Sequence, residues 1–211
     1  MSDHSAAPAQ DSARQPAVDE RLPADNARLL AQNERLLADN ERLLAQNERL
    51  LAAGRDVLER EACCLDEQRW DDWLALYAED CEYWVPTWLT EETLTSDPQA
   101  QLSHIYYANR AGLEDRLVRI RSGRSPASFP LRRTAHLLAN VRLDGAAGER
   151  TIPLRSTWTS HVFDPRHKKS YLFFGRAHYL LEQRGGDWKI AKKKTIIQND
   201  YLPSMVDIYC I

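Results

Sequence analysis

The C-terminal half of the chain consists largely of four long strand-like segments. Apolar and polar residues alternate in three of them, and residues 170–182 are nearly apolar on both faces, as expected of a central strand. In the first segment, Ala135, Leu137 and Ala139 alternate with Thr134 and His136. Successive side chains of a strand point to opposite faces of the sheet, so this period of two predicts strands. The expected strands span residues 133–143, 151–163, 170–182 and 188–198. Short turns such as Asp144-Gly145 and Gly185-Gly186 join them, which indicates an antiparallel meander.

Helical patterns precede these strands. Apolar residues recur at helical spacing over residues 57–65 and again over residues 70–77, with polar residues between, so we expect two successive helices. The remaining expectations are a short strand at 81–85, a loop at 90–100 and a helix at 113–120. Helices followed by long antiparallel strands are typical of an α+β fold. We therefore expect a strongly curved sheet wrapped around the N-terminal helices.

A seven-residue repeat occupies residues 24–51, almost unchanged over four copies. In heptad notation, asparagine occupies every a position: Asn26, Asn33, Asn40 and Asn47. Leucine occupies every d position, at Leu29, Leu36, Leu43 and Leu50. Leucine also occupies every e position, at Leu30, Leu37, Leu44 and Leu51. Such a pattern is typical of a coiled coil, although each asparagine then needs a partner across the seam. A single amphipathic helix lying on the domain is the alternative. Gly54 is expected to break or bend this helix.

The chain thus divides into three expected parts. Residues 1–22 form a disordered tail, residues 23–53 a heptad-repeat helix, and residues 54–211 a folded domain. Hydrophobic residues make up 43% and charged residues 28%, as in ordinary globular proteins. Because the core periodicity begins near Val57, removal of residues 1–52 is expected to leave the domain folded.

Composition and charge exclude several classes of function. The net charge is -3, and the run Lys192-Lys193-Lys194 lies in an alternating segment, so we interpret it as a solvated strand that binds no nucleic acid. No apolar run approaches the roughly 18 residues that a membrane span needs. The N-terminal sequence shows no secretory signal. The four cysteines are expected to be reduced thiols of a cytoplasmic protein.

The motifs of redox and hydrolytic centres are missing from the sequence. A Rieske cluster needs cysteines followed two or three positions later by histidines, and no cysteine here has that neighbour. The closest histidine pair, His161 and His167, straddles a strand end and a Pro-containing loop, and both are expected to be structural. Gly-rich phosphate loops, Gly-x-Ser-x-Gly and Cys-x-x-Cys are also absent. We therefore expect no catalytic, cofactor-binding or metal-binding residues in this chain.

Three segments in the right order resemble the small (β) subunits of aromatic-ring-hydroxylating dioxygenases. They are residues 61–86, with the motifs EACCLDE and YWVP; residues 132–141, RRTAHLLANV; and residues 199–209, NDYLPSMVDIY. The last segment is similar to the C-terminus of the benzoate, anthranilate and salicylate branch. The resemblance covers roughly residues 55–211, and the heptad repeat departs from the family pattern.

The resemblance implies a cone-shaped α+β fold shared with nuclear transport factor 2 and ketosteroid isomerase. It also implies an α3β3 hexamer in which this chain is a non-catalytic subunit. The partner α-subunit would carry a Rieske 2Fe-2S cluster and a mononuclear iron, with NAD(P)H electrons arriving through a reductase or ferredoxin. An aminobenzoate or hydroxybenzoate is the favoured substrate. Pro203 breaks the last strand, so residues 204–211 are expected to leave the sheet and pack either on the domain or against a neighbouring subunit, and the resemblance favours the second.

Two alternatives compete with this interpretation. The first is a self-contained cone-fold isomerase or dehydratase, with His104 beside Tyr106 or Tyr107, or Asp80 beside Tyr83, as its acid–base residues. The second is a pure oligomerisation module driven by the heptads. That reading leaves the well-patterned C-terminal domain unexplained.

Overall fold

The computed structural model describes residues 21–123, 129–202 and 206–211, with side chains from residue 25 onward. Most of the expected tail at residues 1–22 lies outside these ranges. The chain divides into two compact units, and the boundary between them lies between Leu44 and Ala45. The expected domain boundary after residue 53 stays a prediction. No helix within the described ranges is long and apolar enough to cross a membrane.

The N-terminal helical patterns form one continuous helix, α1 (Arg21–Asp66). The expectation that Gly54 breaks the helix is therefore wrong. A Cβ atom on Gly54 would lie only 2.5 Å from Leu154 Cδ1, so glycine lets the helix approach strand β4 (Thr151–Asp164) closely. The second expected helix is α2 (Trp70–Ala75), and the third is α3 (Arg110–Arg121).

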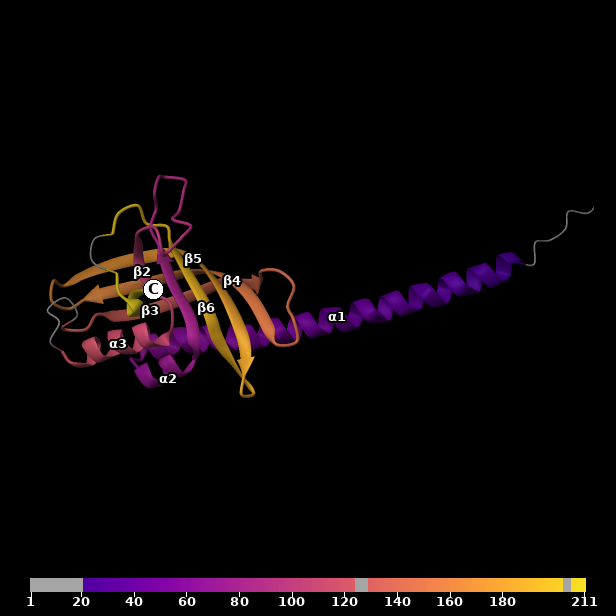
Figure 1. Cartoon of the computed structure of the whole chain (residues 1–211), viewed down its shortest axis with the longest axis horizontal. Coiled ribbons are helices and arrows are strands. Elements are labelled where there is room, and N and C mark those ends of the chain that lie inside the picture. Colours follow the sequence, from indigo (N-terminus) through magenta and orange to yellow (C-terminus); the bar gives the residue numbers. More distant parts are fainter. Residues whose placement is uncertain (1–20, 124–128, 203–205) are drawn as a thin grey trace, which may run out of the picture. The chain divides into compact units, whose positions relative to one another are not determined.

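Six strands form one sheet in the order β2-β1-β6-β5-β4-β3 (Figure 1). Besides β4, they are β1 (Tyr77–Pro86), β2 (Ser103–Tyr107), β3 (Arg133–Leu143), β5 (Lys169–Arg184) and β6 (Asp187–Ile197). The four long strands therefore lie where the alternation predicted them. Neighbours pair in antiparallel fashion except β1 and β6, which run parallel.

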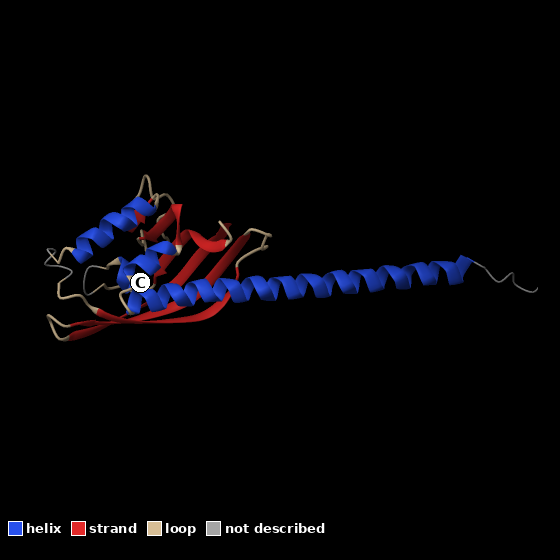
Figure 2. Ribbon diagram, turned by 90° about the horizontal axis from the view of Figure 1, so that it is seen from below, coloured by secondary structure: helices blue, strands red, loops and turns tan. Residues whose placement is uncertain are grey.

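The sheet curves around the domain's helices, which confirms the expected α+β cone. Figure 2 shows α2, α3 and the C-terminal end of α1 within the hollow of the sheet. The core they form with the sheet includes Leu58 from α1, Trp73 from α2, Leu113 from α3 and Leu154 from β4, each fully buried. Such a core removes a large apolar area from water, which is the main stabilising contribution to the fold.

Two local features differ from the expectation. Strand β1 begins at Tyr77, which was expected in a helix, because Tyr77 pairs with Ile190 of β6. Strand β2 was not predicted, since its five residues carry little alternation and follow a polar segment. Within that segment, Trp88 and Leu94 form an isolated bridge.

Candidate functional site

A buried ion pair lies in the interior of the cone. Lys193 on β6 places its Nζ 2.8 Å from Oε1 of Glu61 on α1, and the two side chains are only 4% and 3% exposed. The expectation that Lys192-Lys193-Lys194 is solvated is thus wrong for Lys193. Its neighbours in sequence, Lys192 and Lys194, are exposed and half-buried. Because inward and outward side chains alternate, the middle lysine faces the core.

Two tyrosines complete the coordination of the Glu61 carboxylate. Tyr179 donates a hydrogen bond to Oε2 at 3.1 Å, and Tyr77 donates one to Oε1. Burial raises the pKa of both hydroxyls well above the ordinary tyrosine range, and the nearby Glu61 charge adds to this effect. Lys193 also lies 5.4 Å from the ring centroid of Tyr83. Each charge is therefore compensated, as a buried pair requires.

A histidine–carboxylate pair lies beside this interior, between strand β3 and the end of α1. His136 Nδ1 on β3 is 2.6 Å from Asp66 Oδ1 at the end of α1, and the His136 side chain is 5% exposed. Thr134 also donates to Asp66, at 2.8 Å. Burial alone would raise the pKa of Asp66, but the hydrogen bonds from His136 and Thr134 outweigh it and lower the pKa. The carboxylate thus fixes the orientation of the imidazole ring.

The interior retains a small cavity of about 20 Å³ between these groups. It is lined by His136, Trp158 and Thr195, and the buried polar atoms Nε2, Nε1 and Oγ1 of these residues have no hydrogen-bond partner in the described part of the chain. A cavity of this volume has room for about one water molecule. An aromatic ring is far larger, so the oriented His136 has no space beside it for such a substrate.

The C-terminal segment, residues 207–211, packs in the interior of this chain's own cone. Ile208, Tyr209 and Ile211 are at most 3% exposed and belong to the domain core. Asp207 anchors the segment through an ion pair with Arg116 of α3. Of the two alternatives, packing on the chain's own domain is therefore confirmed for residues 207–211, and the favoured contact with a neighbouring subunit is wrong for them. Residues 203–205 lie outside the described ranges. The segment is apolar because it completes the chain's own core.

The histidine–tyrosine pair proposed from the sequence does not form a site. His104 on β2 is exposed. The hydroxyl of Tyr106 accepts a hydrogen bond from Gln99 at 3.0 Å, and Tyr107 is half-buried. None of these three residues lines the interior cavity.

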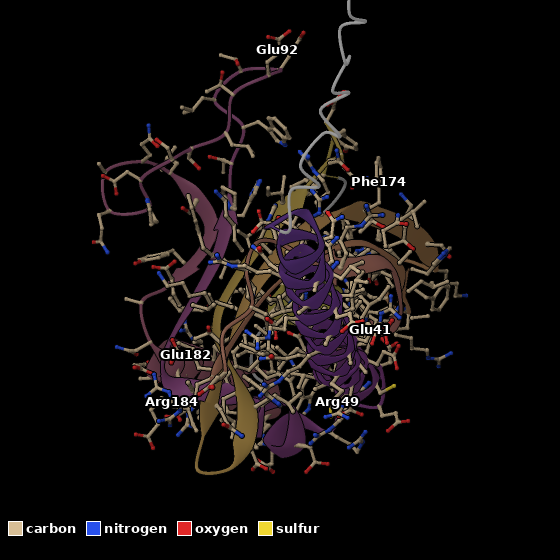
Figure 3. All side chains as sticks on the ribbon, turned by 90° about the vertical axis from the view of Figure 1, so that its right-hand side faces the viewer. Glu41, Arg49, Glu92, Phe174, Glu182 and Arg184 are labelled. Atoms are coloured by element: carbon tan, nitrogen blue, oxygen red, sulfur yellow. The ribbon has the colours of Figure 1, made fainter. Side chains whose placement is uncertain are left out.

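The second proposed pair is also separated. Asp80 is exposed and binds Arg184 at 3.2 Å, next to Glu182 (Figure 3). Tyr83 is fully buried, and its hydroxyl has no partner within the described ranges. A surface carboxylate paired with an arginine and a core tyrosine do not form an acid–base centre.

The two histidines considered as metal ligands also lie apart. His161 is exposed on the outward side of β4, and His167 Nδ1 is 3.0 Å from Asp164 Oδ2. No group of three or more histidine, cysteine, aspartate or glutamate residues that could hold a metal ion occurs among the residues described.

Sequence reasoning missed the residues that do meet in the interior, namely Glu61, His136, Tyr179 and Lys193. One signal was available for Lys193, because it alternates with the inward-facing Ala191, Thr195 and Ile197. Another was available for Glu61, which shares a helical face with Val57 and Leu65 at spacings of four. Neither signal identifies the partner, which lies 132 residues away along the chain.

The outer face of the sheet carries exposed apolar side chains. Leu137 and Phe174 flank Thr159 in adjacent strands, and Leu172 lies two residues from Phe174 on the same face. The exposed fractions of Leu137, Leu172 and Phe174 are 53%, 48% and 41%, and Figure 3 shows Phe174 at the surface. We call these three residues the outer apolar patch. A contiguous apolar patch on a strand face is typical of protein contacts.

An arginine-rich depression adjoins this patch. It has a volume of about 310 Å³ and is lined by Arg142, Arg155 and Arg176, together with His178. His178 Nδ1 lies 2.8 Å from Asp144 Oδ2, so one carboxylate partly balances the charge. Arginine beside apolar side chains is enriched at subunit contacts.

Comparison with known proteins gives these features a context. Residues 60–204 match the family described as ring hydroxylating beta subunit. The benzoate 1,2-dioxygenase subunit beta of Acinetobacter baylyi is 41% identical over 154 residues, which cover 73% of this chain and 89% of that protein. The toluate 1,2-dioxygenase subunit beta of Pseudomonas putida is 41% identical over 161 residues, covering 74% of this chain and 95% of that protein.

A solved structure agrees with these matches. The beta subunit of benzoate 1,2-dioxygenase from Burkholderia mallei is 36% identical, has a TM-score of 0.62, and is covered over 96% of its length by 76% of this chain. Nearly all of that subunit is therefore present here, while about a quarter of this chain has no counterpart in it. The chain belongs to the family of ring-hydroxylating dioxygenase beta subunits.

Proposed function

We propose that this non-catalytic small subunit of an aromatic-ring-hydroxylating dioxygenase stabilises an α3β3 oxygenase in the cytoplasm, and that the outer face of its sheet is a subunit contact. The outer apolar patch is the observation that carries the proposal. Leu137, Leu172 and Phe174 are 53%, 48% and 41% exposed, so covering them with another subunit would contribute roughly half of the 1.5–3 kcal/mol that full burial of such a side chain gives. The arginines beside the patch supply polar contacts at its rim.

The proposed partner is a large subunit that carries a Rieske 2Fe-2S cluster and a mononuclear iron. Electrons from NAD(P)H would reach it through a reductase, with or without a ferredoxin. The substrate class is a benzoate-, anthranilate- or salicylate-like acid, an assignment supported by the relatives named for benzoate and toluate. In this division of labour the small subunit contributes folded surface and core, while the partner binds oxygen and the aromatic acid.

The interior of the cone supports this reading better than a self-contained isomerase or dehydratase. His136 has the oriented imidazole that a general base needs. However, the cavity beside it holds about one water molecule and is partly lined by Ile211 of the buried C-terminal segment. Glu61 and Lys193 neutralise one another and are therefore not available as a separate acid and base.

Co-expression with a Rieske-type large subunit tests the proposal. Native mass spectrometry should find a complex of three copies of each subunit. Phe174→Asp places a charge in the outer apolar patch and should remove most of that complex, without changing the melting temperature of the isolated chain by more than a few degrees. Val118→Asp is the matched control, because Val118 is 66% exposed on α3, which lies on the inner side of the sheet and not on the face that carries the patch. If Phe174→Asp assembles normally, the outer face is not a subunit contact.

A further inference from the structure

The first unit of the chain has a surface that the family function does not use. The heptad segment at residues 24–51 precedes the family match, which begins at residue 60. Its leucines remain exposed in the chain: Leu29, Leu30, Leu36, Leu37, Leu43 and Leu44 have exposed fractions of 57–64%. With two leucines in each heptad, all six lie along one stripe of α1.

An exposed apolar stripe of this kind indicates that another surface packs against it. A helix in a protein gains most of its stability from the packing of its apolar face against another surface. Within the described residues, the apolar side chains of the heptads that pack on the domain core are Leu50 and Leu51, at the C-terminal end of the repeat. The three preceding leucine pairs, 29–30, 36–37 and 43–44, have no such cover. Their exposed face extends over two full heptads.

The asparagines in the stripe indicate that the covering surface is a second copy of the same helix. Each amide offers both a donor and an acceptor, so an asparagine is its own complement. If two copies of the helix pack in parallel and in register, Asn33 meets Asn33 and Asn40 meets Asn40. A single buried asparagine at an a position is known to fix register in this way. An unrelated surface would need an amide-like partner at each seven-residue step.

The charges at the edges of the stripe fit the same arrangement. Glu34 and Glu41 flank the stripe on its e side, while glutamine and aspartate occupy the g positions Gln32 and Asp39 on the other side. Neighbouring parallel helices place one edge against the other, so the glutamates of one copy meet glutamine and aspartate in alternate heptads of the next. Like charges therefore meet only in every second heptad, and each repeat presents the same surface to its copy. We propose that copies of this chain associate in parallel and in register through the Leu/Asn face of residues 26–47.

Site-specific cross-linking tests this proposal in the full chain without a large subunit, so its outcome is independent of the proposed oxygenase assembly. The background carries Cys63→Ser, because Cys63 is the exposed cysteine. In that background, Asn33→Cys should give a disulfide-linked dimer in most of the chain under mild oxidation. Ala38→Cys is the control, because position f lies on the opposite side of the helix from the stripe. It should give at most a tenth as much dimer.

Sedimentation then measures the contribution of the leucines. Leu36→Glu with Leu43→Glu should weaken self-association at least tenfold, whereas Ala38→Glu should leave it unchanged. The double variant should also lose the helical circular dichroism of the heptad segment at low concentration. Equal cross-linking at positions 33 and 38, or a full chain that stays monomeric at high micromolar concentration, would overturn the proposal.

Discussion

Lys193 and Glu61 lie 132 residues apart in sequence, yet Lys193 Nζ is 2.8 Å from Glu61 Oε1 in the centre of the cone. The pair joins strand β6 to helix α1, and both side chains are at most 4% exposed. Its desolvation is expensive, so its presence alone does not indicate a stabilising interaction. Removal of either partner alone, however, leaves an uncompensated buried charge and lowers the free energy of unfolding.

Lys193→Met is therefore expected to destabilise the chain by about 3–5 kcal/mol, because it leaves the Glu61 charge buried and uncompensated. Adding Glu61→Gln should recover at least half of this loss, since glutamine is neutral, accepts a hydrogen bond from one of the two tyrosines Tyr77 and Tyr179, and can donate one to the other. The exposed neighbour serves as the control, and Lys192→Met should change the free energy of unfolding by less than about 0.5 kcal/mol. Urea unfolding measures all three. A Lys193→Met variant within 1 kcal/mol of the parent would contradict this account.

The Asp66–His136 pair predicts a dependence of stability on pH. The pKa of Asp66 is lowered in the folded chain, so its contribution is complete above the unfolded value of about 4 and is lost as pH falls through the folded value. Asp66→Asn should cost about 1.5–3 kcal/mol above pH 5, and the difference from the parent should shrink below about pH 4.

Unfolding free energies measured from pH 2.5 to pH 7 check this expectation. Asp56→Asn is the matched control, because Asp56 is on the same helix and its side chain is 67% exposed. The control should run parallel to the parent curve. A deficit of Asp66→Asn that stays constant down to pH 2.5 would show that the carboxylate charge does not stabilise the fold.

The sequence predicted the secondary structure best where the pattern is long. Strand β3 has the bounds that the alternation predicted, and β4, β5 and β6 differ by one or two residues at their ends. By contrast, β2 has only five residues, too few for a period of two to stand out. The helix continued through Gly54 because a tertiary contact with Leu154 outweighed the low helix propensity of glycine.

The interior site was harder to predict for a different reason. Lysine is normally solvated, so the position of Lys193 on the inward face of an alternating strand was outweighed by its residue type. Its partner Glu61 comes from a helix far away in sequence, and pairing of that kind depends on how the sheet curves. The apolar C-terminus correctly indicated burial for residues such as Ile208 and Tyr209. The sequence contains no signal that distinguishes the chain's own core from a neighbour's surface.

The C-terminal segment should contribute to the stability of the isolated chain. Tyr209 is 2% exposed and packs edge-on against Trp70, with ring centroids 6.2 Å apart. Tyr209→Ala is expected to cost about 3–5 kcal/mol, as for other large aromatic side chains in cores. Tyr201 is 76% exposed, and Tyr201→Ala should cost less than about 0.5 kcal/mol. If thermal unfolding of the isolated chain is equally insensitive to both changes, the segment is not part of this chain's core.

Truncation should separate the two compact units. A chain that begins at Ala45 retains Leu50, Leu51 and every other side chain packed on the domain core, so it should unfold cooperatively in urea. Removal of residues 1–52 also deletes Leu50 and Leu51 and should lower the free energy of unfolding by a further 1–3 kcal/mol, roughly, since both are half-buried. If the chain that begins at residue 53 is as stable as the chain that begins at Ala45, Leu50 and Leu51 do not contribute to the free energy of unfolding. If the chain that begins at Ala45 does not unfold cooperatively, the deleted heptads are an integral part of the domain.

The most direct test of the central claim is oxygen uptake in reconstituted mixtures with benzoate, anthranilate or salicylate. With a Rieske-type large subunit, reductase and NADH, this chain should support uptake that depends on one of these acids. The chain with reductase and NADH alone should show none, and the large subunit without this chain should lose most of its activity. Aromatic turnover by the chain alone, or full activity of the large subunit without it, would contradict its assignment as a structural subunit.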